Sequence, residues 1–99
     1  EAARALAERI VKQETDDSAR FQELFASALG RTITEAEQEV LASLLKNHES
    51  YYSNRLEDAK KLLSVGNYPR DEKLDPAEHA AWTSVCRAVI NMHEFVTRY

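Results

Sequence analysis

Residues 75–96, DPAEHAAWTSVCRAVINMHEFV, decide the fold of this chain. Asp75 can cap a helix that has Pro76 at its first position and Glu78 three residues after the cap, which is typical of helix N-termini. The apolar residues that follow at helical spacing are Trp82, Val85, Val89, Met92 and Val96, with Ala81, Ala88 and Phe95 widening the apolar arc. So wide an arc predicts burial on more than one side. We therefore expect this helix to be central, with Trp82 and Met92 in the core.

A polar strip runs along the opposite side of the same helix. Its residues are Thr83, Ser84, Arg87, Asn91, Glu94 and Arg98. Glu94 and Arg98 are four residues apart, a spacing at which opposite charges meet on a helix surface.

The same periodicity predicts three more helices upstream. Apolar residues recur at helical spacing over residues 2–13, 17–29 and 34–65. In the third segment, Asn54 can act as a second N-cap with Glu57 three residues later, so we expect a break or kink near Ser53–Asn54. A long loop at 66–74 follows. The short connection at 30–33 should make the second and third helices antiparallel neighbours. The predicted fold is all-α, an up-down bundle of four helices with the third kinked.

Residues that favour helix capping stand at the ends of the predicted helices. Residues 15–18 (TDDS) offer N-caps for the second helix. Gly30 stands where a left-handed residue would close that helix. Thr34 and Glu37 have the spacing of a capping box at the start of the third helix. The apolar stripe of the third helix is expected to contain Val40, Leu41, Leu44, Leu45, His48, Tyr51 and Tyr52.

Length and composition limit the number of domains and argue against nucleic acid or a membrane as a partner. The 99 residues make one domain at most. The net charge of −4 and the scattered Lys and Arg residues argue against nucleic acid, which needs a basic face. No apolar run approaches the roughly 20 residues of a transmembrane helix, so we expect no membrane insertion. The chain starts at Glu1 within a helical pattern, and we expect 1–99 to be a single helical domain cut from a larger protein.

Histidine and cysteine do not form a recognisable metal site or catalytic pair. No two of the three histidines lie three or four residues apart, so no helix presents two of them as ligands. Cys86 is the single cysteine. His93 follows it by seven residues, which is about 10.5 Å along a helix and too far for a thiol and its base to touch. We interpret both as core residues and predict no metal and no cofactor.

Carboxylates are numerous, but their positions have a structural explanation. Glu35 and Glu39, Asp16 and Asp17, and Asp71 and Glu72 fall at helix starts or in the loop, where acidic groups are favoured. There is no phosphate-binding glycine loop and no Ser–His–Asp arrangement. The sequence contains no catalytic constellation and leaves open whether the chain serves an enzyme.

Several segments together resemble a known family. Residues 25–31 (FASALGR) with 34–37 (TEAE), 62–66 (LLSVG) with Pro69, 74–78 (LDPAE), 82–86 (WTSVC) and 90–96 (INMHEFV) resemble, in order and spacing, the C-terminal part of a family of large exported proteins of planctomycetes and related bacteria. Its domain is known as domain of unknown function 1553. Asn91 and Glu94 match its ending motif. Arg55 departs from it, since members often have Pro at that position.

The resemblance implies context rather than a reaction. Such domains end long exported chains, often downstream of a c-type-cytochrome-like domain, and are suspected of a role in polysaccharide or surface biology. It implies a periplasmic or cell-surface location for this chain, the upstream domains as its partners, and polysaccharide as a ligand of the parent protein. The haem motif of the cytochrome-like domain is missing from these 99 residues, so haem is not implied here.

Two functional hypotheses follow. The first is a structural or protein-interaction role as a helical C-terminal module, because the wide apolar arc of the last helix invites further cover. The second is that the chain contributes part of a carbohydrate-binding or catalytic site completed by an upstream domain. Its candidate residues are Tyr51, Tyr52, Tyr68, Asn91 and Glu94. The two hypotheses are distinguished by whether these side chains converge in one cleft, as the second requires, or lie scattered.

Overall fold

The computed structural model describes residues 2–64 and 73–97, with side chains as far as Met92 in the last helix. Its described residues form five helices and no strand: α1 (Ala2–Gln13), α2 (Asp17–Leu29), α3 (Glu35–Ser53), α4 (Leu56–Leu63) and α5 (Pro76–Thr97). The all-α prediction is confirmed. The fifth helix arises because the break or kink expected near Ser53–Asn54 is a complete break.

Hydrogen bonding at the α3–α4 corner explains the break. Asn54 Nδ2 donates to the Ser50 carbonyl oxygen at 3.0 Å, so a side chain takes an acceptor of the last helical turn. Arg55, with φ −140° and ψ 64°, leaves the helical conformation and its amide donates to the Tyr52 carbonyl oxygen at 3.1 Å. Asn54 therefore ends α3. The prediction that it caps the following helix is wrong, since Arg55 precedes α4 without a side-chain cap.

The other predicted helix ends are confirmed. Asp16 Oδ2 accepts from the Ala19 amide at 3.1 Å, and Asp75 Oδ2 accepts from the Glu78 amide at 3.1 Å. Gly30 closes α2 at φ 67°, a left-handed conformation that glycine adopts without strain. The capping box at the start of α3 has both of its hydrogen bonds, between Thr34 and Glu37. Gly66 and most of the expected 66–74 loop lie outside the described residues.

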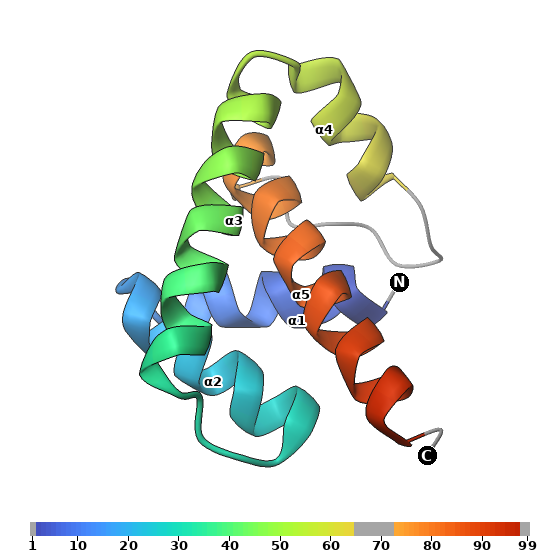
Figure 1. The fold of residues 1–99 in the computed structure, drawn as a ribbon. Coiled ribbons are helices and arrows are strands. Elements are labelled where there is room, and N and C mark those ends of the chain that lie inside the picture. The colour runs from blue at the N-terminus through green and yellow to red at the C-terminus, as the bar shows by residue number, and fades with distance from the viewer. Residues whose placement is uncertain (1, 65–72, 98–99) are drawn as a thin grey trace.

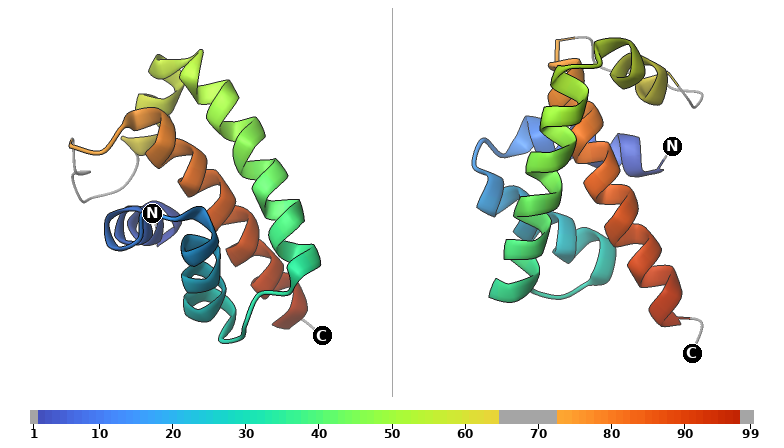
Figure 2. Two further views of the ribbon diagram at one scale, coloured as in Figure 1. Left: turned by 90° about the vertical axis from the view of Figure 1, so that its left-hand side faces the viewer. Right: turned by 45° about the horizontal axis from the view of Figure 1, so that its top comes forward.

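α5 is the central helix, as predicted, and packs against each of the other four helices. α3 and α5 run side by side in opposite directions, whereas α1 crosses them and is seen end-on in Figure 2, left. This crossing differs from the up-down bundle of four helices expected from the sequence, which is not confirmed. α4 covers the start of α5 through a second small cluster of Ala59, Leu63 and Ala80.

The main core surrounds Trp82, which is fully buried as predicted. Its ring centroid lies 4.9 Å from that of Phe21, with the planes inclined at 42°. Met92 was expected in the core together with Trp82, but it is 44% exposed. The C-terminal end of α5 extends past α1 (Figure 1), so fewer helices cover that end. Val40 of α3 is likewise exposed, at 67%, rather than part of the core.

The predicted polar strip of α5 is only partly exposed. Arg87 and Asn91 are exposed and Ser84 is half-buried, but Thr83 is buried. Thr83 tolerates burial because its hydroxyl donates to the His79 carbonyl oxygen one turn earlier, at 2.8 Å. Among the described residues, no helix has the length and apolarity needed to cross a membrane.

Candidate functional site

Arg20 connects three helix ends through a guanidinium that is only 8% exposed. Its Nε donates to the Glu14 carbonyl oxygen at 2.7 Å, and its Nη2 donates to the Val11 carbonyl oxygen at 3.2 Å. These carbonyl groups belong to the C-terminal end of α1, where the helix itself offers no donors. Nη1 lies 3.3 Å from Glu78 Oε2 in the first turn of α5.

Further groups surround the same guanidinium. Asp17 Oδ1 lies 3.6 Å from Nη1, and the Trp82 ring centroid lies 5.6 Å from the guanidinium carbon. Glu49 faces this region from α3: burial raises its pKa, and the charges of Asp17 and Glu78 raise it further. We call Glu14, Asp17, Arg20, Glu78 and Trp82 the Arg20 cluster. Its contacts hold α1, α2 and α5 together, which is a structural role.

The first two predicted binding residues, Tyr51 and Tyr52, lie together at the α3–α4 corner. Their rings meet edge to face at 5.0 Å between centroids, and His48 stacks on Tyr52 at 6.3 Å. The Arg55 guanidinium carbon lies 4.4 Å from the Tyr51 ring centroid. Burial lowers the pKa of His48, so its ring favours the neutral form. We call His48, Tyr51, Tyr52 and Arg55 the aromatic corner.

The aromatic corner is tied to its surroundings by weak polar contacts. Tyr51 Oη donates to Asp58 Oδ2 at 3.4 Å, and Tyr52 Oη lies 3.5 Å from Ser84 Oγ on α5. Asn91 is exposed and follows Ser84 by seven residues, about 10 Å along α5, so it does not join the corner. Tyr68 and the side chain of Glu94 lie outside the described part of the chain.

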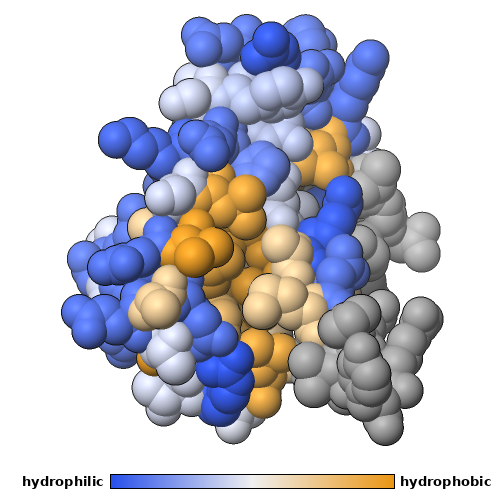
Figure 3. Space-filling view, viewed as in Figure 1, coloured by the Kyte–Doolittle hydropathy of each residue, from blue (hydrophilic) through white to orange (hydrophobic). Residues whose placement is uncertain are grey.

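A small apolar pocket opens between α2, α3 and α5. It has a volume of about 220 Å³, and it is lined by Phe25, Ala36, Glu37, Val40, Leu41 and Met92. We call it the Val40–Met92 pocket. Figure 3, seen from the same side as Figure 1, shows apolar residues gathered between α3 and α5. The sequence pattern assigned Val40 to an apolar stripe and Met92 to the core. It did not predict that both side chains are exposed.

An ion pair forms the polar edge of this pocket. Arg31 Nη1 and Nη2 donate to the two carboxylate oxygens of Glu37 at 2.9 and 2.6 Å, and the Thr34 amide donates to Glu37 Oε1. The Arg31 hydrogen bonds and that of Thr34 lower the pKa of Glu37 to about 2. Arg31 also lies over the Phe25 ring, 5.1 Å from its centroid. The pocket is therefore apolar inside and neutral in net charge at this edge.

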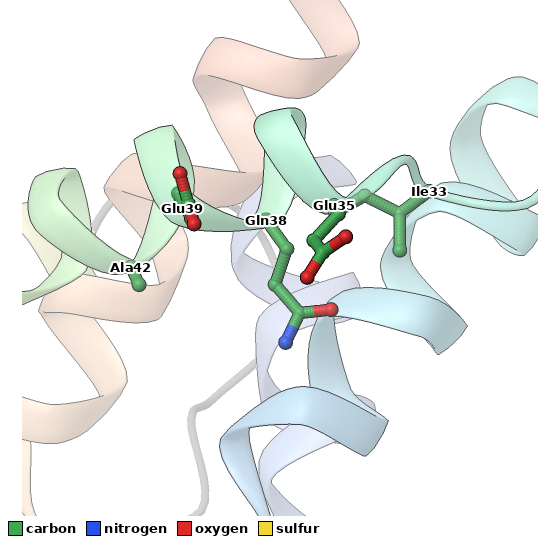
Figure 4. Close-up of a pocket in the computed structure, with 5 residues that line it drawn as sticks. All are labelled: Ile33, Glu35, Gln38, Glu39 and Ala42. Atoms are coloured by element: carbon green, nitrogen blue, oxygen red, sulfur yellow. The ribbon is translucent and has the colours of Figure 1, made fainter.

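A larger and shallower hollow lies on the other side of the start of α3. Its volume is about 520 Å³, and it is lined by Ile33, Glu35, Gln38, Glu39 and Ala42. Figure 4 shows the Glu35 and Gln38 side chains pointing toward α2. Gln38 Nε2 donates to Ser18 Oγ at 3.1 Å, so this amide is used within the fold. The two carboxylates suit the start of a helix, and their presence does not indicate a ligand.

His79 and Cys86 carry side chains that can take part in catalysis, but both are buried. His79 is fully buried, with Nε2 3.3 Å from the Arg4 carbonyl oxygen, and the sequence did not single it out. Burial raises the pKa of the Cys86 thiol to about 12, which keeps it protonated and unreactive. In the described ranges, no three His, Cys, Asp or Glu side chains are grouped closely enough to hold a metal ion. The side chain of His93 lies outside them.

Comparison with protein families, curated proteins and solved structures finds no match to this chain. The Arg20 cluster is enclosed, the aromatic corner is partly covered, and the Val40–Met92 pocket is open and apolar. Of the three, the pocket has the properties of a binding surface.

Proposed function

We propose that this chain is a helical protein-interaction module that docks a partner at the Val40–Met92 pocket. The observation that carries the proposal is the exposure of two large apolar side chains, Val40 at 67% and Met92 at 44%, beside one apolar hollow. Removing such side chains from water on binding is favourable, by about 25 cal/mol for each Å² of apolar surface. Because this apolar surface is still exposed after folding, its burial can favour the binding of a partner.

The chemistry of the pocket defines the kind of anchor it takes. Its volume of about 220 Å³ has room for one large apolar side chain. Met92 adapts to irregular shapes because its side chain is flexible and polarisable. The edge is formed by the Arg31–Glu37 ion pair, which neutralises its own charge. An amphipathic helix that presents one leucine, methionine or aromatic anchor is therefore the partner we infer.

The family resemblance extends this proposal to the setting. We infer that the chain serves as a C-terminal module of a large exported protein of the planctomycete type, with domain of unknown function 1553. Its first partners would then be upstream domains of the same protein. The resemblance carries this part of the proposal, and a periplasmic or cell-surface location follows from it alone.

The test is a selection of displayed helical peptides against the chain, with binding then measured for two variants. Met92→Glu introduces a charge into the pocket. Leu56→Glu is the matched control, because Leu56 is 47% exposed and lies at the α3–α4 corner, away from the pocket. Selected peptides should bind the wild type and the Leu56 variant equally and lose at least about tenfold in affinity, 1.4 kcal/mol, with the Met92 variant. Peptides that are indifferent to Met92→Glu would refute the proposal.

A second candidate function is carbohydrate binding at the aromatic corner. The observation in its favour is that Tyr51 is 44% exposed and adjoins Tyr52. Against it, Arg55 covers a face of the Tyr51 ring on which a sugar would stack. Titration with soluble oligosaccharides, followed by tyrosine fluorescence in the wild type and in Tyr51→Ala, tests this candidate. A saturable change that is absent from the variant would favour it over the helical partner.

A further inference from the structure

The outer face of α3 carries an uncharged seam with the spacing of a coiled coil. Ala36, Val40, Ser43, Asn47 and Ser50 are exposed and follow one another at intervals of four, three, four and three residues. Intervals that alternate in this way place side chains in one line along a helix that faces another helix. We call these five residues the α3 seam.

The α3 seam differs from an ordinary solvent-facing helix surface, which carries charged residues along its centre. Leu41 and Leu45, the buried residues of α3, point away from it into the core. At the middle of the seam, Val40 is the most exposed of the large hydrophobic residues in the described part of the chain. Ser43 and Ala36 beside it are small, and small side chains allow a second helix to approach closely.

Charged residues on one flank of the seam define which partner fits. Glu39 and Lys46 are exposed and seven residues apart, so they lie on the same side of the seam, with the exposed Glu35 one turn before Glu39. When two identical helices pack antiparallel about a two-fold axis, the same flank of each helix meets its counterpart. Glu39 of one copy then faces Lys46 of the other, and the reciprocal pair forms on the other side of the axis. This flank of the seam is thus complementary in charge to the same flank of a second copy.

We propose that two copies of this chain associate through the α3 seam, antiparallel, with Val40 of each copy beside Ser43 of the other. The inference rests on the proposed function, because it names a second copy as a partner of the surface that includes Val40. Asn47 meets Ala36 in this register, and a polar residue in such a seam specifies alignment at the expense of stability. With one large apolar residue per copy, the dimer is weak and depends on concentration.

Charge reversal tests the register directly. Glu39→Lys places Lys against Lys across the axis and Lys46→Glu places Glu against Glu, so each variant alone opposes like charges there. The double variant, Glu39→Lys with Lys46→Glu, exchanges the charges and restores both pairs. Light scattering after size exclusion, over about a hundredfold range of concentration, gives the mass of each species. The wild type and the double variant should rise above 11.3 kDa toward twice that mass, and each single variant should remain monomeric.

Mixing and control experiments make the result specific. The two single variants, mixed in equal amounts, should form a heterodimer although neither self-associates. Glu57→Lys on α4 changes an exposed charge away from the seam and should associate like the wild type. Circular dichroism confirms that each variant is folded.

The outcomes separate this inference from the proposed function. A wild type that is monomeric throughout the range overturns the dimer, as does a double variant that fails to recover. If helical peptides still bind in a Met92-dependent way to a monomeric chain, the interaction role stands and only the second copy is wrong. If the dimer forms and no helical peptide binds at the pocket, the dimer stands and the docking of a helical partner at the pocket is wrong.

Discussion

The Arg20 cluster and the α3 seam lie on the same bundle and use polar groups in opposite ways. In the cluster, a buried cation contacts two backbone carbonyl oxygens, two carboxylates and an aromatic ring. In the seam, polar and small side chains face outward around an exposed valine. In the cluster, the guanidinium finds its hydrogen-bond and ion-pair partners within the fold. The seam, by contrast, leaves the apolar side chain of Val40 exposed to solvent. The first region therefore stabilises the fold, and the second is the one that we propose as a surface for association.

The largest expected effect comes from Trp82, the aromatic ring of the Arg20 cluster. Trp82→Ala removes a fully buried side chain that packs on Phe21 and lies under Arg20. The lost burial and the cavity left behind should cost about 4 kcal/mol of the free energy of unfolding. Chemical denaturation followed by circular dichroism measures it. A loss below about 1 kcal/mol would show that the core does not depend on this residue.

Arg20→Ala should have the next largest effect. Glu78 would lose a buried cationic partner and α1 would lose donors to its terminal carbonyl groups, which together should cost about 3 kcal/mol. The matched control is Arg9→Ala, since Arg9 pairs with Glu23 at 3.0 Å on the surface, with both side chains more than a third exposed. That pair should contribute less than about 1 kcal/mol. Equal losses in the two variants would contradict the structural role of the Arg20 cluster.

Adjacent residues of α3 sharpen the comparison. Val40→Ser should change the free energy of unfolding by no more than about 0.5 kcal/mol, because the side chain is already in water. Leu41→Ala, one residue further, should cost about 2–3 kcal/mol because Leu41 is buried. Denaturation is followed at a concentration low enough to keep the chain monomeric. A large loss in the Val40 variant would mean that this residue belongs to the core after all.

The smallest effect concerns acid stability at the edge of the pocket. The pKa of Glu37 is about 2 in the folded chain, against an ordinary value of 4.5. Because the folded value is the lower one, the Arg31–Glu37 pair contributes stability above about pH 4.5 that is lost as the pH falls toward 2. Glu37→Gln keeps the capping box and removes the charge. Its unfolding midpoint should vary less with pH over this window than that of the wild type, and an identical pH profile would contradict the ion pair.

Local signals predicted the helix ends but not the arrangement of the helices. The caps at Asp16, Thr34 and Asp75 and the left-handed Gly30 could be predicted because they depend on hydrogen bonds within one turn. A break or kink was expected near Ser53–Asn54, and the structure has a full break there. It depends on the Asn54 side chain reaching the Ser50 carbonyl oxygen, which the sequence does not disclose.

Burial was predicted correctly where several helices meet and wrongly at the end of the bundle. Trp82 lies where α5 is covered on all sides, whereas Met92 lies where that cover ends. Periodicity identifies the apolar side of a helix but not how far its neighbours extend. Arg20 was missed because a buried cation depends on partners from α1 and α5. The only local signal was its spacing of four residues from Leu24, which places it beside an apolar face.

The candidate binding residues were brought together only in part. Tyr51 and Tyr52 meet because they are neighbours on α3, and Asn91 lies about two turns beyond Ser84, which contacts Tyr52. The distance between Asn91 and the two tyrosines could not be predicted from the sequence, because it depends on the alignment of α3 with α5. The residues that now define the candidate surface, Val40 and Met92, were present in the predicted stripes with the wrong exposure.

The central claim is that the α3 seam is a surface for association, and the most direct test is the amide NMR spectrum at increasing concentration. The signals of Ala36, Val40, Ser43 and Asn47 should shift together as the chain self-associates, while those around Arg20 stay in place. A spectrum that does not change with concentration, or changes that map to α4 or α1 instead, would contradict it.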